Sequence, residues 1–72
     1  MTVQIEILLR MGRQIARNNA ALPPERAAAK IAGHLTSFWT PAMIAELQAF
    51  AALNPADLDP NLLAALRRLD RG

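Results

Sequence analysis

The side chains that could do chemistry are few and scattered along this sequence of 72 residues. The single histidine, His34, lies three residues before Ser37, a spacing that brings no carboxylate to orient the imidazole for nucleophilic catalysis. Cysteine is absent, which excludes thiolate metal sites and disulfides. The six acidic residues occur singly, and the three glycines do not form a phosphate-binding loop. The sequence therefore predicts a protein that is not an enzyme and has no catalytic, cofactor-binding or metal-binding residues of its own.

The arginines near the start of the chain show the most informative spacing. Four polar side chains lie on one side of a predicted helix, away from its apolar residues: Arg10, Arg13, Gln14 and Arg17. One interpretation is an ordinary solvated face, on which Glu6 pairs with Arg10 one turn away. The other is a docking strip for an anionic partner, because guanidinium groups bind carboxylates and phosphates through paired hydrogen bonds. Met11 lies beside the strip, where its flexible side chain suits packing or contact with a partner.

The largest side chains form a second group of candidates. Phe38 and Trp39 both belong to the apolar stripe of a predicted helix, but adjacent helical residues differ by about 100° in direction, so one small core cannot centre both. We expect one of them at a contact surface, where tryptophan is a common anchor, although a single tryptophan in a small bundle is more often a core residue. His34 lies at the border of this stripe. Its ordinary interpretation is a half-buried histidine hydrogen-bonded to a carbonyl, and contact with a partner is the alternative.

The elements that must position these residues are helices. Alanine and leucine supply most of the apolar residues, which favours helix, and no segment alternates with the period of a strand. Prolines divide the chain, since Pro24 and the pairs Thr40-Pro41 and Asp59-Pro60 are typical of helix starts. The predicted helices cover about residues 3–19, 24–39, 41–53 and 60–70. We predict one all-α domain over residues 1–72, a compact bundle of three to four short helices without a sheet.

The charge distribution limits the classes of partner. The net charge is only +2, with +3 on residues 1–33 and −1 on residues 34–72. Nucleic-acid-binding domains usually carry a stronger basic footprint, so a nucleic-acid-binding helical module is a minor alternative. No apolar run approaches the ~20 residues that span a bilayer. The side chains on the apolar face of the first helix are too small for that face to insert into a membrane surface. We expect a cytoplasmic protein that binds neither nucleic acid nor membrane.

Several segments together resemble the delta subunit of the cytoplasmic NAD-dependent molybdenum formate dehydrogenases. The segments are the opening Ile7-Leu8-Leu9-Arg10-Met11-Gly12-Arg13-Gln14-Ile15, the stretch Ile31-Ala32-Gly33-His34-Leu35, the run Phe38-Trp39-Thr40-Pro41-Ala42-Met43, and Leu58-Asp59-Pro60 before a leucine-rich helix. Each segment alone is a weak signal, whereas their order and spacing over about residues 5–68 are specific to the family.

The resemblance implies an accessory subunit that binds the large catalytic alpha subunit and supports assembly or stability of the complex. It implies that this chain holds no cofactor, while partner subunits carry molybdenum bis-pterin, iron–sulfur clusters, FMN and NAD. A transient maturation chaperone for molybdenum cofactor insertion is the alternative. We expect nine residues to contact the partner: Arg10, Met11, Arg13, Gln14, Arg17, His34, Phe38, Trp39 and Met43.

Overall fold

A computed structural model describes residues 2–70 of the chain, with side chains for residues 5–70. The elements are α1 (Thr2–Asn18), α2 (Pro24–Phe38), α3 (Pro41–Leu53), the single 3₁₀ turn η1 (Pro55–Asp57) and α4 (Pro60–Asp70). Because the described residues contain no strand, the predicted all-α bundle is confirmed. Only the two ends of α1 and the end of α2 differ from the predicted bounds, each by one residue.

The helix starts follow from local chemistry. Thr40 has extended backbone angles (φ −75°, ψ 156°), and its Oγ1 accepts a hydrogen bond of 3.2 Å from the backbone N–H of Met43. Asp59 plays the same part for α4, since its Oδ1 accepts a hydrogen bond of 2.8 Å from the backbone N–H of Asn61. Each cap satisfies a backbone donor that has no partner inside the helix. Proline in the first turn has no N–H and so leaves no donor without an acceptor, which is why these pairs predict the helix starts so closely.

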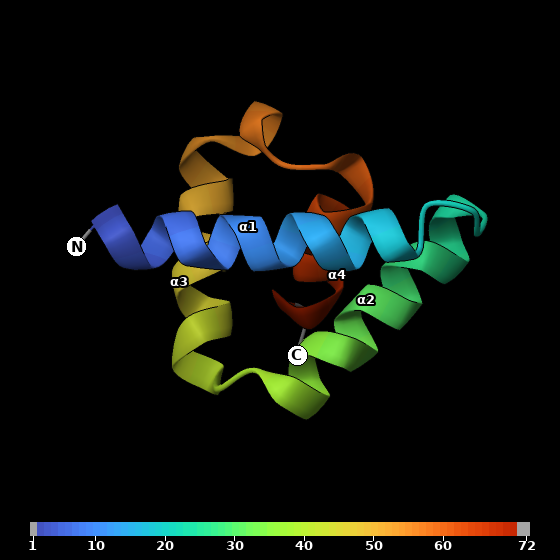
Figure 1. Ribbon diagram of the computed structural model, residues 1–72, viewed down its shortest axis with the longest axis horizontal. Coiled ribbons are helices and arrows are strands. Elements are labelled where there is room, and N and C mark those ends of the chain that lie inside the picture. Colours follow the sequence, from blue (N-terminus) through green and yellow to red (C-terminus); the bar gives the residue numbers. More distant parts are fainter. Residues whose placement is uncertain (1, 71–72) are drawn as a thin grey trace.

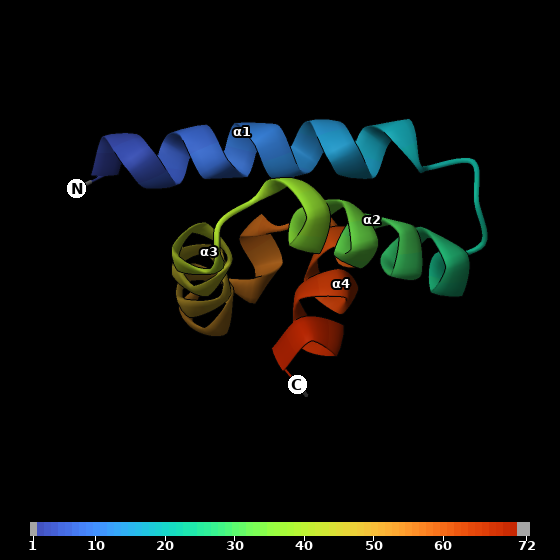
Figure 2. The ribbon, with the colours of Figure 1, turned by 90° about the horizontal axis from the view of Figure 1, so that it is seen from below.

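The four helices form two layers. Figure 1 shows α1 crossing in front of α3 and α4, and Figure 2 shows it as a separate layer on one side of the other three helices. Of the helix pairs, α2 and α4 make the most extensive contact, whereas α1 contacts each of the other helices less extensively. One face of α1 therefore meets the bundle, and the opposite face is turned away from it.

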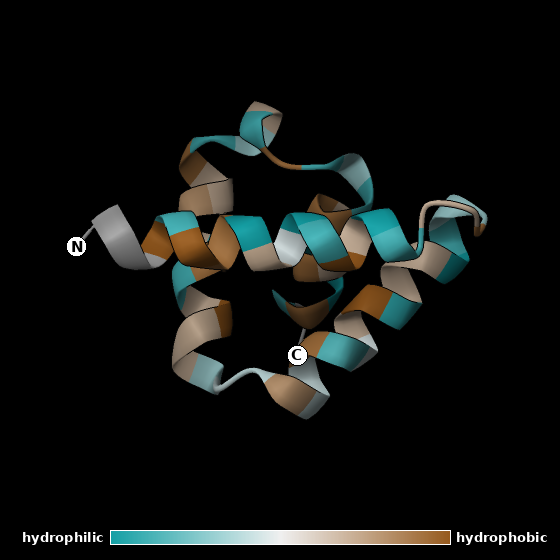
Figure 3. Cartoon of the chain, viewed as in Figure 1, coloured by the Kyte–Doolittle hydropathy of each residue, from teal (hydrophilic) through white to brown (hydrophobic). Residues whose placement is uncertain are grey.

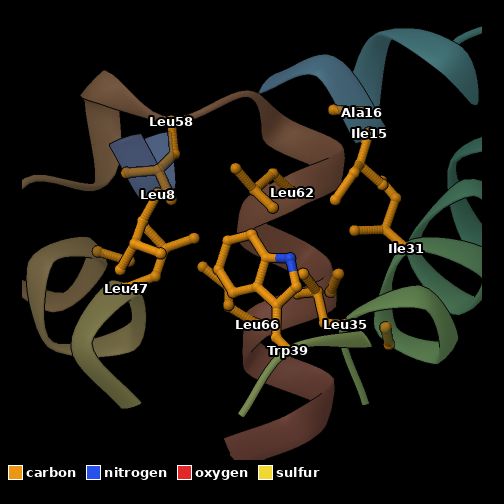
Figure 4. Close-up of a cluster of buried hydrophobic side chains, with 13 residues drawn as sticks. Leu8, Ile15, Ala16, Ile31, Leu35, Trp39, Leu47, Leu58, Leu62 and Leu66 are labelled. Atoms are coloured by element: carbon orange, nitrogen blue, oxygen red, sulfur yellow. The ribbon is translucent and has the colours of Figure 1, made fainter. Parts of the chain in front are cut away.

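The core lies between these layers. Its largest fully buried side chains come from α2, α3 and α4, namely Ile31, Leu35, Leu47, Leu62 and Leu66. Helix α1 adds Leu8, Ile15 and Ala16 from its inner face. Figure 4 shows the Trp39 indole in the middle of this cluster. Trp39 is 6% exposed, so the more usual core position of a single tryptophan is confirmed.

A glycine allows α1 to lie close to α4. A Cβ atom added to Gly12 would be 2.9 Å from Cδ2 and 3.4 Å from Cδ1 of Leu62, and 3.6 Å from Cδ2 of Leu47. The first of these distances is shorter than carbon atoms tolerate, and the fully buried Leu62 has little room to move. Gly12 thus sets the spacing between the two layers.

The end of α2 separates the two adjacent aromatic residues. The backbone turns extended at Trp39 (φ −98°, ψ 150°), while its N–H still donates to the Leu35 carbonyl at 2.8 Å. The indole enters the core from this position. Phe38, which shares the apolar stripe of α2 by its spacing, is instead 74% exposed. Of the two residues, the phenylalanine is therefore the one that a partner could contact, and its place at a contact surface stays a prediction.

Candidate docking surface

The predicted arginine strip lies on the outer face of α1. We call it the basic strip, and it consists of the exposed residues Arg10, Arg13, Gln14 and Arg17. The inner face of the same helix is buried through Leu8 and Ile15, so the helix period holds the strip away from the core. With Glu6 and Leu9, the strip lines one shallow surface hollow. Figure 3 shows hydrophilic residues recurring along α1 in the front layer.

No side-chain hydrogen bond within the described residues occupies the basic strip. The described side-chain hydrogen bonds are made by Asn19, Thr36, Thr40, Gln48, Asn54 and Asp59. Most of these bonds cap a helix or return to the preceding turn. The only one between distant residues joins Gln48 Nε2 to the Leu66 carbonyl at 3.1 Å. The guanidinium groups of the strip therefore keep their donors for water or for a partner.

Two apolar side chains run beside the strip. Ile7 is 47% exposed and Met11 is 39% exposed, and the two are one turn apart on α1. We call this pair the apolar edge. Residues four apart on a helix are surface neighbours, as are residues three apart, so Ile7 adjoins both Met11 and Arg10. The outer face of α1 thus presents charge and apolar surface side by side.

Acidic residues lie beside both ends of the strip. Arg13 and Arg17 line a second shallow hollow together with Asp57 and Asp59, which belong to the connection between α3 and α4. Negative charge nearby lowers the positive potential of these two arginines. Arg10 and Gln14 line the first hollow but not the second. The first hollow is also lined by Glu6, one turn before Arg10, so each end of the strip has an acidic neighbour.

His34 and Phe38 form a separate exposed pair on α2. Their ring centroids are 4.7 Å apart, and the rings are tilted by 43°. His34 is exposed, so the prediction of a half-buried histidine is wrong. His34 lies one turn before the exposed Phe38, on the side of α2 away from the buried Ile31 and Leu35. The pair offers an aromatic surface that is distinct from the basic strip.

Two of the nine predicted contact residues lie elsewhere. Trp39 belongs to the core, and Met43 is half-buried against that core at the start of α3. The structure thus brings Arg10, Met11, Arg13, Gln14 and Arg17 together on α1 and places His34 with Phe38 on α2. Neither Trp39 nor Met43 shares these surfaces.

Sequence reasoning missed the outer face of α3. Leu53 is 83% exposed, and four alanines on the same helix are exposed as well, namely Ala42, Ala45, Ala49 and Ala52. A signal for this face was present, since Glu46 is the only charged residue of α3 and the helix is apolar on all sides. A helix with that composition is usually buried on more than one face.

The described residues thus define a small all-helical protein whose candidate site is an exposed, charged helix face. Among these residues, no helix has the length and apolar character needed to cross a membrane. The same part of the chain contains no group of three or more histidine or acidic side chains placed to hold a metal ion.

A comparison with protein families matches residues 7–66 to the family described as the NADH-dependent formate dehydrogenase delta subunit, FdsD. Because this range covers most of the 72 residues, the chain belongs to that family, and the resemblance seen in the sequence is confirmed. Comparisons with curated proteins and with solved structures gave no match. The matched range contains the whole basic strip and the apolar edge.

Proposed function

We propose that this chain is an accessory subunit that binds the catalytic alpha subunit of an NAD-dependent formate dehydrogenase and supports assembly or stability of that complex. The family match over residues 7–66 carries the proposal. In this proposal the chain acts in the cytoplasm and is not itself the catalyst. The molybdenum bis-pterin, iron–sulfur clusters, FMN and NAD are held by the other subunits.

Two surfaces support a binding role. The first is the basic strip with the apolar edge on α1, and the second is the exposed pair of His34 and Phe38 on α2. A large aromatic side chain that is 74% exposed, such as Phe38, is of the type that anchors protein interfaces. Trp39 and Met43 pack in or against the core and are not part of either surface.

Co-purification tests the proposal directly. An affinity-tagged chain is expressed with the other subunits, and we expect the alpha subunit to elute with it. Size-exclusion chromatography of the cofactor-loaded complex then measures stoichiometry. One copy of this chain per alpha subunit is the expected result for a resident subunit. Recovery only with the cofactor-free enzyme would identify a transient maturation chaperone instead, and no recovery with either form would refute the proposed function.

Loss of the chain gives a second test. In a strain that lacks it, we expect less assembled complex, and we expect the remaining complex to lose activity faster during incubation at the growth temperature. The measurement is the amount of complex per cell and its half-life. An unchanged yield and half-life would contradict a role in assembly or stability.

A further inference from the structure

Exposed side chains recur along α2 at steps of four residues. Arg26, Lys30, His34 and Phe38 each adjoin the next on the helix surface, and we call them the α2 row. The first two are cations, and the last two are the ring pair with centroids 4.7 Å apart. None of the side-chain hydrogen bonds in the described part of the chain uses a residue of this row. The row thus passes from charged to aromatic along one side of the helix.

The middle of this side of α2 is open. Ala29, Gly33 and Ser37 lie beside the α2 row, and all three are exposed. A Cβ atom added to Gly33, which is three residues after Lys30, would meet nothing within 4 Å. No other element therefore covers α2 next to Lys30, and a partner can approach the row without displacing part of the chain.

The acidic residues of the other elements lie away from the α2 row. Glu6 lines a hollow on α1, and Asp57 and Asp59 line a second hollow beside the same helix. Asp70 lines a hollow against α3. Glu46 belongs to α3, which makes no extensive contact with α2. No residue of α2 lines any of these hollows.

The acidic residue of α2 itself also lies off the row. Glu25 directly precedes Arg26, so the two side chains point about 100° apart. The surface neighbours of Glu25 three and four positions later are Ala28 and Ala29. Its place in the first turn suits the helix dipole. The positive charges of Arg26 and Lys30 therefore have no acidic neighbour, unlike those of the basic strip on α1.

We propose that the α2 row docks an acidic segment of the catalytic subunit, and that this segment carries an apolar anchor at one end. The inference rests on the proposed function and deepens it, since it states the chemistry of the segment that is bound. Arg26 would donate two parallel hydrogen bonds to one carboxylate, and Lys30 would pair with a second. The anchor would cover the Phe38 ring, which lies two helical turns and about 12 Å along α2 from Lys30.

Other occupants fit one end of the row only. A second copy of this chain would bring the same positive row to this face, and the two rows would repel each other. Single-stranded nucleic acid could stack a base on Phe38, but two cations give it few phosphate contacts. An acidic protein segment suits both ends, because its carboxylates meet the cations and its apolar side chain extends the dry part of the interface over Phe38.

The test measures the affinity of the full-length chain for formate dehydrogenase complex purified without it, by biolayer interferometry at low and at high salt. We expect Lys30→Glu to weaken binding by at least about 20-fold at low salt, because it turns an attraction into a repulsion. This loss should shrink at high salt. Phe38→Ala should weaken binding by about 10-fold at both salt concentrations, since the contact that it removes is apolar.

Two matched controls isolate the site. Arg68→Glu makes the same charge reversal at an exposed position in the last turn of α4, and we expect it to change affinity less than about 3-fold. Leu53→Ala removes an apolar side chain that is as exposed as Phe38 but lies on α3, and we expect no change. Far-UV circular dichroism of every variant verifies that it is folded.

The outcomes separate this inference from the proposed function. If the unmodified chain does not bind the complex, the proposed function fails. If it binds but Lys30→Glu matches Arg68→Glu, the acidic occupant is wrong and the proposed function stands. Equal affinities of Phe38→Ala and Leu53→Ala would overturn the apolar anchor. Displacement of the complex by single-stranded DNA of random sequence, which Lys30→Glu no longer binds, would identify nucleic acid as the occupant instead.

Discussion

The buried core and the outer surface of the protein contain the same residue types in opposite environments. Trp39 and Leu47 are buried in the core, whereas Phe38 and Leu53 are the two most exposed large apolar residues described. Packing therefore depends on position in the fold and not on residue type alone. Core residues stabilise the fold, and residues of the outer surface are the ones that a partner can contact. The two regions can be tested separately, because a substitution in one should leave the other intact.

The largest contrast should come from the two adjacent aromatic residues. Trp39→Ala empties the middle of the core and should cost about 3–5 kcal/mol, which approaches the whole stability of a domain of this size. Phe38→Ala should change the free energy of unfolding by less than about 0.5 kcal/mol, since this side chain is mostly exposed. Urea denaturation of both variants is followed by circular dichroism, because Trp39→Ala removes the only tryptophan and with it the fluorescence signal.

A cost above about 1.5 kcal/mol for Phe38→Ala would show that its ring packs against other residues in solution. The contrast between a buried Trp39 and an exposed Phe38 would then be wrong. His34→Ala serves as the control, since it removes the ring next to Phe38 and leaves the core unchanged. We expect its effect on stability to be as small as that of Phe38→Ala.

The sequence predicts the helices better than it predicts the exposure of Phe38, for a physical reason. Helix starts are local, since Thr40 with Pro41 and Asp59 with Pro60 contain their own caps and dihedral preferences. Burial depends on which distant helix covers a residue. Periodicity puts Phe38 on the apolar stripe, yet Phe38 is exposed between the buried Leu35 and Trp39. Spacing alone does not show which of these side chains a distant helix will cover.

A smaller contrast is expected between two leucines of α3. Leu47→Ala should destabilise the fold by about 2–5 kcal/mol, because this side chain is fully buried between α1 and α4. Leu53→Ala should change stability by less than about 0.5 kcal/mol. Thermal unfolding of both variants under one buffer condition measures the difference. Equal melting temperatures would mean that the outer face of α3 is covered, for example by self-association, which analytical ultracentrifugation would detect.

The candidate site was predictable in part. The basic strip follows from helix period alone, since Leu8 and Gly12 fix the inner side and the arginines must then face outwards. The opposing aspartates were not predictable, because the chain places Asp57 beside Arg17 only through the packing of α1 against the α3–α4 connection. The exposed outer face of α3 was not predicted, because a helix that is apolar on all sides does not indicate which of its faces the neighbouring helices cover.

The two helical glycines sharpen the comparison further. Nothing lies within 4 Å of a Cβ atom added to Gly33, so Gly33→Ala should stabilise the fold by about 0.5–1 kcal/mol through helix propensity. Gly12→Ala gains the same propensity, but its Cβ would meet Leu62 at 2.9 Å, and overpacking costs about 1–3 kcal/mol. We expect a net loss of stability for Gly12→Ala in urea denaturation. Stabilisation equal to that of Gly33→Ala would show that α1 and α4 can move apart at Gly12 without loss of packing energy.

The smallest contrast concerns two exposed threonines, which differ in their position in a helix and not in burial. It tests whether that position alone determines the effect of a substitution on stability. Thr40 caps α3, so Thr40→Ala leaves the Met43 N–H without its acceptor and should cost about 1 kcal/mol. Thr36 lies inside α2, where its hydroxyl donates to the Ala32 and Gly33 carbonyls at 3.1 and 3.0 Å, groups that the helix already engages. Thr36→Ala should therefore stabilise by a few tenths of a kcal/mol through helix propensity. Thermal unfolding resolves the opposite signs. Matching losses would mean that the Thr36 hydroxyl bonds matter as much as a cap, and that local hydrogen bonding, not the helix terminus, controls stability on this surface.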